Sequence, residues 1–161
     1  MNIRTIVGNG IVAALYIAVS AVIQPFGFTN VQFRVSEMFN HLIVFNKKYF
    51  FGIVLGVFLT NLFFSPIVAY DLFFGVLHSV ISLLITIFAA KYIKSMIGLM
   101  IVNSIVFTFN MFIIAIELKL AFNLPFFFTW LTTAAGELVV LAVGIPIMYA
   151  IHKRVNFSKM I

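Results

Sequence analysis

A short polar stretch interrupts a chain that is otherwise strongly apolar. In NVQFRVSEMFN, residues 30–40, an arginine and a carboxylate stand three positions apart at Arg34 and Glu37. At that spacing they can pair on one face of a helix that begins at Ser36 as its N-cap. The same two groups, together with Gln32, can instead present donors and an acceptor to a polar ligand. The residues leave both interpretations open, and Arg34 can serve both.

A second pair of titratable groups falls on one helical face further along the chain. Asp71 and His78 are seven residues apart, and Ser82 follows one turn later. Asp71 can also be a helix N-terminal charge that interacts favourably with the macrodipole, and His78 can simply bond a neighbouring helix. Because no second histidine stands at ligand spacing, the sequence predicts no metal site.

The last apolar segment places Trp130, Thr133 and Glu137 on one helical face. If this segment crosses a membrane, a carboxylate near the centre costs on the order of 2.5–3.5 kcal/mol, so Glu137 should face a partner or a cavity. Trp130 is also typical of an anchor at the membrane boundary. Asn61 and Asn110 can contribute to a site at comparable depth, or form interhelical hydrogen bonds of about 0.6 kcal/mol each. The candidate binding residues are Gln32, Arg34, Glu37, Asn61, Asp71, His78, Asn110, Trp130 and Glu137.

Composition indicates the environment that must hold these side chains. Of the 161 residues, 64% are hydrophobic and 9% are charged, whereas soluble domains have about 45–50% and about 25%. We therefore predict an all-α polytopic membrane protein with a single domain, residues 1–161. The net charge of +6 is divided among short basic groups between apolar segments, which favours membrane topology over a nucleic-acid partner. The absence of cysteine excludes disulfides and metal–thiolate sites.

Apolar segments long enough for helices recur six times. A transmembrane helix needs about 20 mainly apolar residues. The predicted helices cover residues 5–24, 37–46, 49–65, 70–91, 95–116 and 126–151. The second is too short to cross alone, so we expect it to be half-buried within the bundle. The first resembles a secretory signal, but five apolar segments follow it, so we interpret it as a retained helix.

The basic residues give the orientation. Eight of the ten fall at one face if both termini are cytoplasmic, and only Arg34 and Lys119 fall at the other. On this topology Glu37, Asp71 and Glu117 lie at or near the outer face. Glu137 lies about 16 Å into the last helix, at 1.5 Å per residue. The outer half of the bundle is therefore predicted to be acidic.

Small residues form a stripe along the first helix, at Gly10, Ala14, Ala18 and Ala21. Such a stripe lets another helix approach closely. That helix can belong to the same monomer, since Gly52 and Gly56 form a similar stripe on the third predicted helix. It can also belong to a separate membrane subunit. No nucleotide-binding or hydrolase motif is present, so we predict no catalytic residue and no cofactor. Uphill transport would then draw its energy from another polypeptide or an ion gradient.

Three motifs resemble one transporter family. They are VQFRVSE, YDLFFGVLHS and GELVVLAVGIPIMYAIHK, which lie in the family's order within residues 8–154. They resemble the QueT family, the substrate-binding S components of energy-coupling factor (ECF) importers. The resemblance implies a six-helix S component with a ligand pocket in its outer half. It also implies docking through Ala14 and Ala18 to a transmembrane scaffold subunit driven by two cytoplasmic ATPases, and preQ1 (7-aminomethyl-7-deazaguanine) as ligand.

The residue types agree with such a ligand. Neighbouring N–H donors on a guanine-like edge suit one carboxylate, and its carbonyl suits Arg34 or Gln32. A cationic aminomethyl group suits a second acid from among Glu37, Asp71 and Glu137. Three alternatives remain: an S component for another small vitamin-like solute, an ion-coupled carrier, although no inverted repeat is evident, and an intramembrane enzyme with Asp71 and His78 as acid–base partners.

Overall fold

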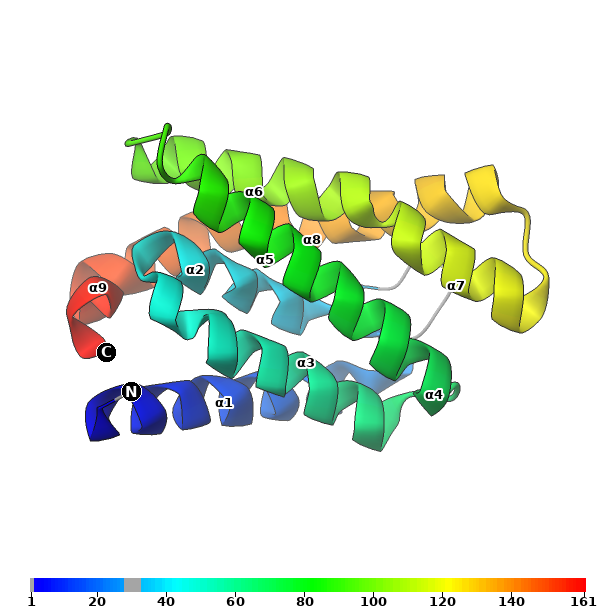
Figure 1. The fold of residues 1–161 in the computed structure, drawn as a ribbon, viewed down its shortest axis with the longest axis horizontal. Helices are drawn as coiled ribbons and strands as arrows, with labels where there is room; N and C mark the ends of the chain where they lie inside the picture. Colours follow the sequence, from blue (N-terminus) through cyan, green and yellow to red (C-terminus); the bar gives the residue numbers. More distant parts are fainter. Residues whose placement is uncertain (1, 28–32) are drawn as a thin grey trace.

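The structure, a computed structural model, describes residues 2–27 and 33–161 and contains only helices in these ranges. The helices lie side by side in one elongated bundle, with both termini at the same end (Figure 1). The long helices are α1 (Ile3–Gly27), α3 (Phe50–Phe64), α5 (Val76–Ala89), α6 (Met96–Asn110), α7 (Phe112–Phe122) and α8 (Phe126–Val155). Short turns complete the bundle: η1 (Val35–His41), α2 (Leu42–Phe45), η2 (Lys47–Tyr49), α4 (Val68–Tyr70), η3 (Asp71–Gly75) and α9 (Phe157–Met160).

Among the described residues, five helical segments are long and apolar enough to cross a membrane. They are Ile3–Gln24, Lys47–Phe64, Val68–Ala89, Met96–Phe122 and Phe126–Val155, and the apolar helix Val35–Phe45 is shorter. This confirms the predicted all-α polytopic membrane protein and its short second helix. The fifth predicted helix, 95–116, was too short, because the chain stays helical after Met111 until Asn123 turns left-handed at φ 54°. Glu117 therefore lies inside a helix and not in a loop.

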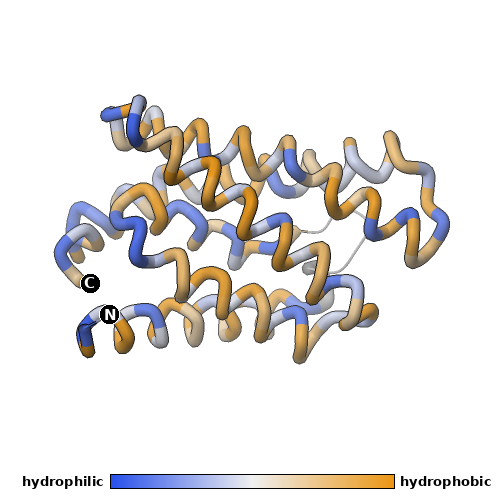
Figure 2. Tube along the Cα trace, viewed as in Figure 1, coloured by the Kyte–Doolittle hydropathy of each residue, from blue (hydrophilic) through white to orange (hydrophobic). Residues whose placement is uncertain are grey.

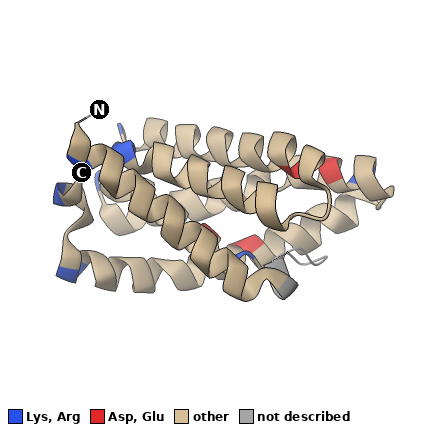
Figure 3. Cartoon of the chain, turned by 90° about the horizontal axis from the view of Figure 1, so that it is seen from below, with Lys and Arg blue, Asp and Glu red and all other residues tan. Residues whose placement is uncertain are grey.

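Charge is divided between the two ends of the bundle. Lysines and arginines gather at the end that carries both termini, while the acidic residues lie in the other half (Figure 3). Hydrophobic residues cover the long helices, and hydrophilic ones gather at the basic end (Figure 2). This arrangement matches the charge asymmetry on which the predicted orientation rests.

The short helix η1 is fixed inside the bundle by a buried polar network. The ring nitrogen Nε2 of His41 lies 2.9 Å from the carbonyl oxygen of Leu141 in α8. Its Nδ1 lies 3.3 Å from the side-chain amide of Asn103 in α6, whose carbonyl accepts a 2.8 Å bond from Thr86 of α5. These bonds tie η1 to three long helices and so position the polar residues that precede His41.

The two small-residue stripes have different surroundings. On α3, Gly52 and Gly56 are buried against α1, and the backbone N–H of Gly52 donates to Asn9 Oδ1 at 2.6 Å. On α1, the stripe Gly10, Ala14, Ala18 and Ala21 is exposed on the outside of the bundle. Packing within the monomer therefore explains the α3 stripe but not the α1 stripe.

We expect Gly52→Ala to destabilise the protein by about 1–3 kcal/mol, the usual cost of overpacking. The added Cβ would lie 2.9 Å from the Cα and 2.8 Å from the carbonyl oxygen of Asn9, so the backbone of α1 would have to shift. Thermal unfolding of the purified protein in detergent measures the effect. Gly10→Ala is the matched control on α1, because its Cβ meets no atom within 4 Å. Equal stability of the two variants would contradict this account of the α1–α3 contact.

Candidate functional site

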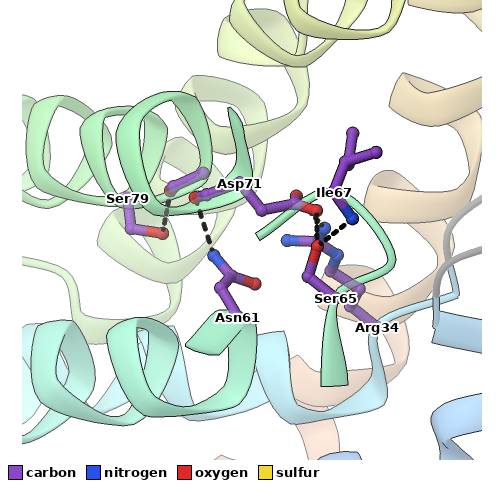
Figure 4. Close-up of polar contacts among 7 residues, drawn as sticks. Arg34, Asn61, Ser65, Ile67, Asp71 and Ser79 are labelled. Atoms are coloured by element: carbon purple, nitrogen blue, oxygen red, sulfur yellow. Dashed lines mark hydrogen bonds and ion pairs between the residues drawn. The ribbon is translucent and has the colours of Figure 1, made fainter. Parts of the chain in front are cut away.

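The polar cluster in the acidic half is built around Arg34, which precedes η1. Its Nη2 donates to Oδ1 of Asp71 at 3.1 Å, with both side chains largely buried. The other carboxylate oxygen of Asp71 accepts from the hydroxyl of Ser65. The amide of Asn61 donates to the backbone carbonyl of Asp71 at 3.0 Å (Figure 4). Asp71 is thus held by residues from three segments of the chain.

The turn that carries Asp71 has π-helical geometry, with Asp71–Gly75 forming η3. Such turns are rare in helices and are frequent at functional sites. A Cβ at Gly75 would lie 2.7 Å from Nδ2 of Asn61. A larger residue there would therefore push the Asn61 amide away from its bond with the carbonyl of Asp71.

A second carboxylate, Glu37, lies within η1 and is 2% exposed. Its Oε2 accepts from the side-chain amide of Asn40, one turn later, and the hydroxyl of Tyr16 lies beside it. The predicted N-cap at Ser36 was wrong, because η1 already begins at Val35 and has no side-chain cap. The hydroxyl of Ser36 instead accepts a 2.7 Å bond from Ser20 of α1. These contacts hold η1 against α1.

The cluster contains more carboxyl groups than its arginine can balance. Burial lowers the pKa of Arg34, but the neighbouring carboxylates of Asp71, Glu37 and Glu117 outweigh it, and the pKa is raised above its ordinary value. Arg34 therefore stays charged. A fourth carboxyl, Glu137, interacts with both Glu37 and Arg34. All four acidic side chains are at most 3% exposed, so their charges are poorly screened by water.

Several buried polar atoms of this half have no hydrogen-bond partner among the described residues. Glu117 lacks one at both carboxyl oxygens, and Glu137 lacks one at Oε1. The side-chain oxygens of Asn40 and Thr60 are also unsatisfied. A buried carboxylate without a donor costs several kcal/mol. Hydrogen-bond donors on a bound molecule would remove that cost.

A small cavity adjoins Arg34. Its volume is about 20 Å³, which is the room of about one water molecule. The polar residues that line it are Tyr16, Ser20, Arg34, Ser36, Thr60 and Asn61. A nucleobase needs far more space than this cavity has, so the surrounding side chains would have to move for one to bind here.

The structure brings five of the predicted residues together: Arg34, Glu37, Asn61, Asp71 and Glu137. His78 interacts electrostatically with Glu37 and Arg34, and its Nε2 is 3.1 Å from the carbonyl oxygen of Phe107. The amide of Asn110 donates to Ser82 Oγ at 2.9 Å, as an interhelical bond. Gln32 lies outside the described residues.

The two predicted residues of α8 face different surroundings. Glu137 is 1% exposed and interacts with Glu37 and Arg34. The indole of Trp130 donates to the carbonyl of Phe109 at 3.1 Å. It lines an apolar groove of about 570 Å³ between α6 and α8, together with Phe127 and Leu131. Trp130 therefore has the surroundings of a packing residue, whereas Glu137 belongs to the cluster.

Sequence reasoning missed Glu117 as a site residue. The predicted helix 95–116 ended just before it, and the predicted topology placed it at or near the outer face. One signal could have found it, namely that it stands in the apolar run FIIAIEL, at a helical spacing from Ile113 and Ile114.

The fold and the cluster together define a multi-pass membrane protein with buried, incompletely satisfied polar groups in one half. Residues 6–153 match the model of the family described as QueT transporter. The chain is also 33% identical over 163 residues to "Queuosine precursor transporter QueT" of Lactococcus lactis subsp. cremoris strain MG1363, which covers 96% of this chain and 95% of that protein. No solved structure matches this chain. The chain belongs to the QueT transporter family, and the resemblance seen in its motifs is confirmed.

Proposed function

We propose that this bacterial membrane transporter is the substrate-binding S component of an ECF importer, and that it captures the queuosine precursor preQ1 at the outer face. The Lactococcus relative is named for transport of a queuosine precursor. The observation that carries the proposal is the composition of the cluster, in which one guanidinium faces four buried carboxyl groups. Such a surplus of acceptors suits a cationic ligand that is rich in donors.

Recognition follows from the donor pattern of the ligand. The Watson–Crick edge of a deazaguanine carries neighbouring N–H donors, which one carboxylate can accept together. Glu137 and Glu37 are suitable because they are close enough to interact electrostatically with each other and with Arg34. The ring carbonyl needs a donor, and Arg34 is the cation that these carboxyl groups surround.

Partner subunits would supply the energy. The chain has no nucleotide-binding motif, so we propose that it performs no chemistry and docks a scaffold subunit linked to two cytoplasmic ATPases. The exposed stripe Gly10, Ala14, Ala18 and Ala21 on α1 supports this, because no helix of the described chain covers it. In cells that lack the ATPase subunits we expect no uptake. Uptake that persists there would favour an ion-coupled carrier.

We expect Glu37→Gln and Glu137→Gln each to weaken preQ1 binding by at least about tenfold. A hydrogen bond to a charged group contributes about 1.5–3 kcal/mol, and a neutral amide also offers one acceptor fewer. Isothermal titration calorimetry of the purified protein measures the affinity. Lys119→Gln is the control, because it changes the charge by one unit at an exposed position. Unchanged affinity in both glutamate variants would contradict the assignment, and a higher affinity for another solute would favour a different S component.

A further inference from the structure

Glu117 is a buried carboxyl group that the fold does not satisfy. It lies on α7 with 0% of its surface exposed, and neither oxygen has a hydrogen-bond partner among the described residues. Two neighbouring residues of α7, Ile114 and Leu118, are packed in an apolar cluster. Lys119, the nearest basic residue in sequence, is exposed. Nothing in the local packing of α7 therefore accounts for an acid at this position.

The surroundings of Glu117 connect it with the candidate site. Helix α7 packs against α8 and against η3. Glu117, together with Asp71 and Glu37, favours the charged form of Arg34 and raises its pKa. Asp71 already accepts from Arg34 and from Ser65, and Glu37 accepts from Asn40. Glu117 lies beside the carboxyl group of Asp71, and, like Oε1 of Glu137, its oxygens accept no hydrogen bond from a donor among the described residues.

The chain brings Glu117 inward through the break at Met111. Helix α6 ends at Asn110 and α7 begins at Phe112, so the chain changes course within one crossing. Glu117 then lies less than two turns before the end of α7. Glu137 is about 11 residues into α8 and lies beside Glu37. The two incompletely satisfied carboxyl groups are therefore carried by different helices, where they can contact different parts of one ligand.

We propose, on the basis of the function proposed above, that Glu117 binds the primary ammonium group of the substrate and makes the protein select an aminomethylated precursor over neutral ones. An ammonium group has three donors and no acceptor, which matches a carboxylate with two unsatisfied oxygens. A ligand without the cation would leave Glu117 buried and unpaired. Sites built to hydrogen-bond one group reject analogues that lack it much more strongly than apolar pockets reject a missing methylene.

A matched pair of ligands tests the proposal. The two are 7-aminomethyl-7-deazaguanine and 7-cyano-7-deazaguanine, which share the ring but differ in the cation. Calorimetry of Glu117→Gln should show at least about tenfold weaker binding of the amine, as for loss of one charge-assisted hydrogen bond. Binding of the nitrile should be unchanged or tighter. Glu137→Gln is the comparison variant, and it should weaken both ligands because it contacts the shared ring.

The outcomes separate this inference from the proposed function. A wild-type protein that binds neither ligand would overturn the proposed function. A wild-type protein that binds the amine, together with a Glu117→Gln variant that loses both ligands equally or neither, would overturn only the role of Glu117. Selective loss of the amine in Glu137→Gln would likewise assign the ammonium to the other acid.

Stability provides a second readout. Glu117 is buried beside a second acid, Asp71, and replacing one of two adjacent buried acids by a neutral amide should stabilise the ligand-free protein. We therefore expect Glu117→Gln to unfold at a higher temperature than the wild type in detergent. A variant that is less stable, or that fails to fold, would show that Glu117 has a structural role and would contradict the proposal.

Discussion

Replacing Ala14 and Ala18 together by leucine should reduce precursor uptake to background while substrate affinity stays unchanged. Both residues lie on the exposed side of α1, whereas Tyr16 and Asn9 make the contact with α3. Two leucines would keep a partner helix from the close approach that small residues allow. Uptake is measured in cells that also contain the proposed scaffold and ATPase subunits, and affinity is measured by calorimetry on the purified variant.

Ala142→Leu is the matched control for this experiment. Ala142 is an exposed alanine on α8. Its replacement is the same alanine-to-leucine change on the exposed surface, but it lies outside the α1 stripe. We expect its uptake to equal that of the wild type. Normal uptake by the double leucine variant would show that α1 faces lipid throughout the transport cycle, and would remove the proposed docking surface.

Periodicity and composition were sufficient to predict the bundle, because a membrane requires long apolar helices whatever their partners are. They were not sufficient to orient small-residue stripes. Gly10 and Gly52 stand in similar patterns, yet one is exposed and the other contacts the backbone of Asn9. Which side of a helix meets a neighbour depends on the packing of the whole bundle, and neither helix sequence encodes it alone.

The sequence was sufficient to predict most residues of the candidate site, but not which of them bond to each other. Arg34 and Glu37 stand three residues apart in the sequence, and the pattern left an ion pair within one helix open as one of two interpretations. The structure instead pairs Arg34 with Asp71, 37 residues away. The spacing of Asp71 and His78 also suggested a partnership, but Asp71 bonds Arg34 and Ser65 while His78 bonds Phe107. Contacts between distant segments decide which groups remain for a ligand, and a single sequence does not contain them.

Arg34→Met should be the most destabilising of the substitutions considered, by about 3–5 kcal/mol, the typical cost of removing one partner from a buried ion pair. The guanidinium is the positive charge that Asp71, Glu37 and Glu117 surround. Without it, the buried carboxyl groups repel one another and lose a donor. Thermal unfolding in detergent and the yield of folded protein from membranes measure the loss.

Two further variants show whether charge compensation is the cause. Arg34→Lys keeps the charge but not the planar guanidinium, so its stability should lie between the wild type and Arg34→Met. Adding Asp71→Asn to Arg34→Met removes one of the uncompensated acids and should recover part of the loss. Arg154→Met, at an exposed position of the basic end, should leave stability unchanged. If Arg34→Met were as stable as Arg154→Met, the acidic half would have to hold its carboxyl groups without a counter-charge, and the surplus of acceptors would no longer indicate a cationic ligand.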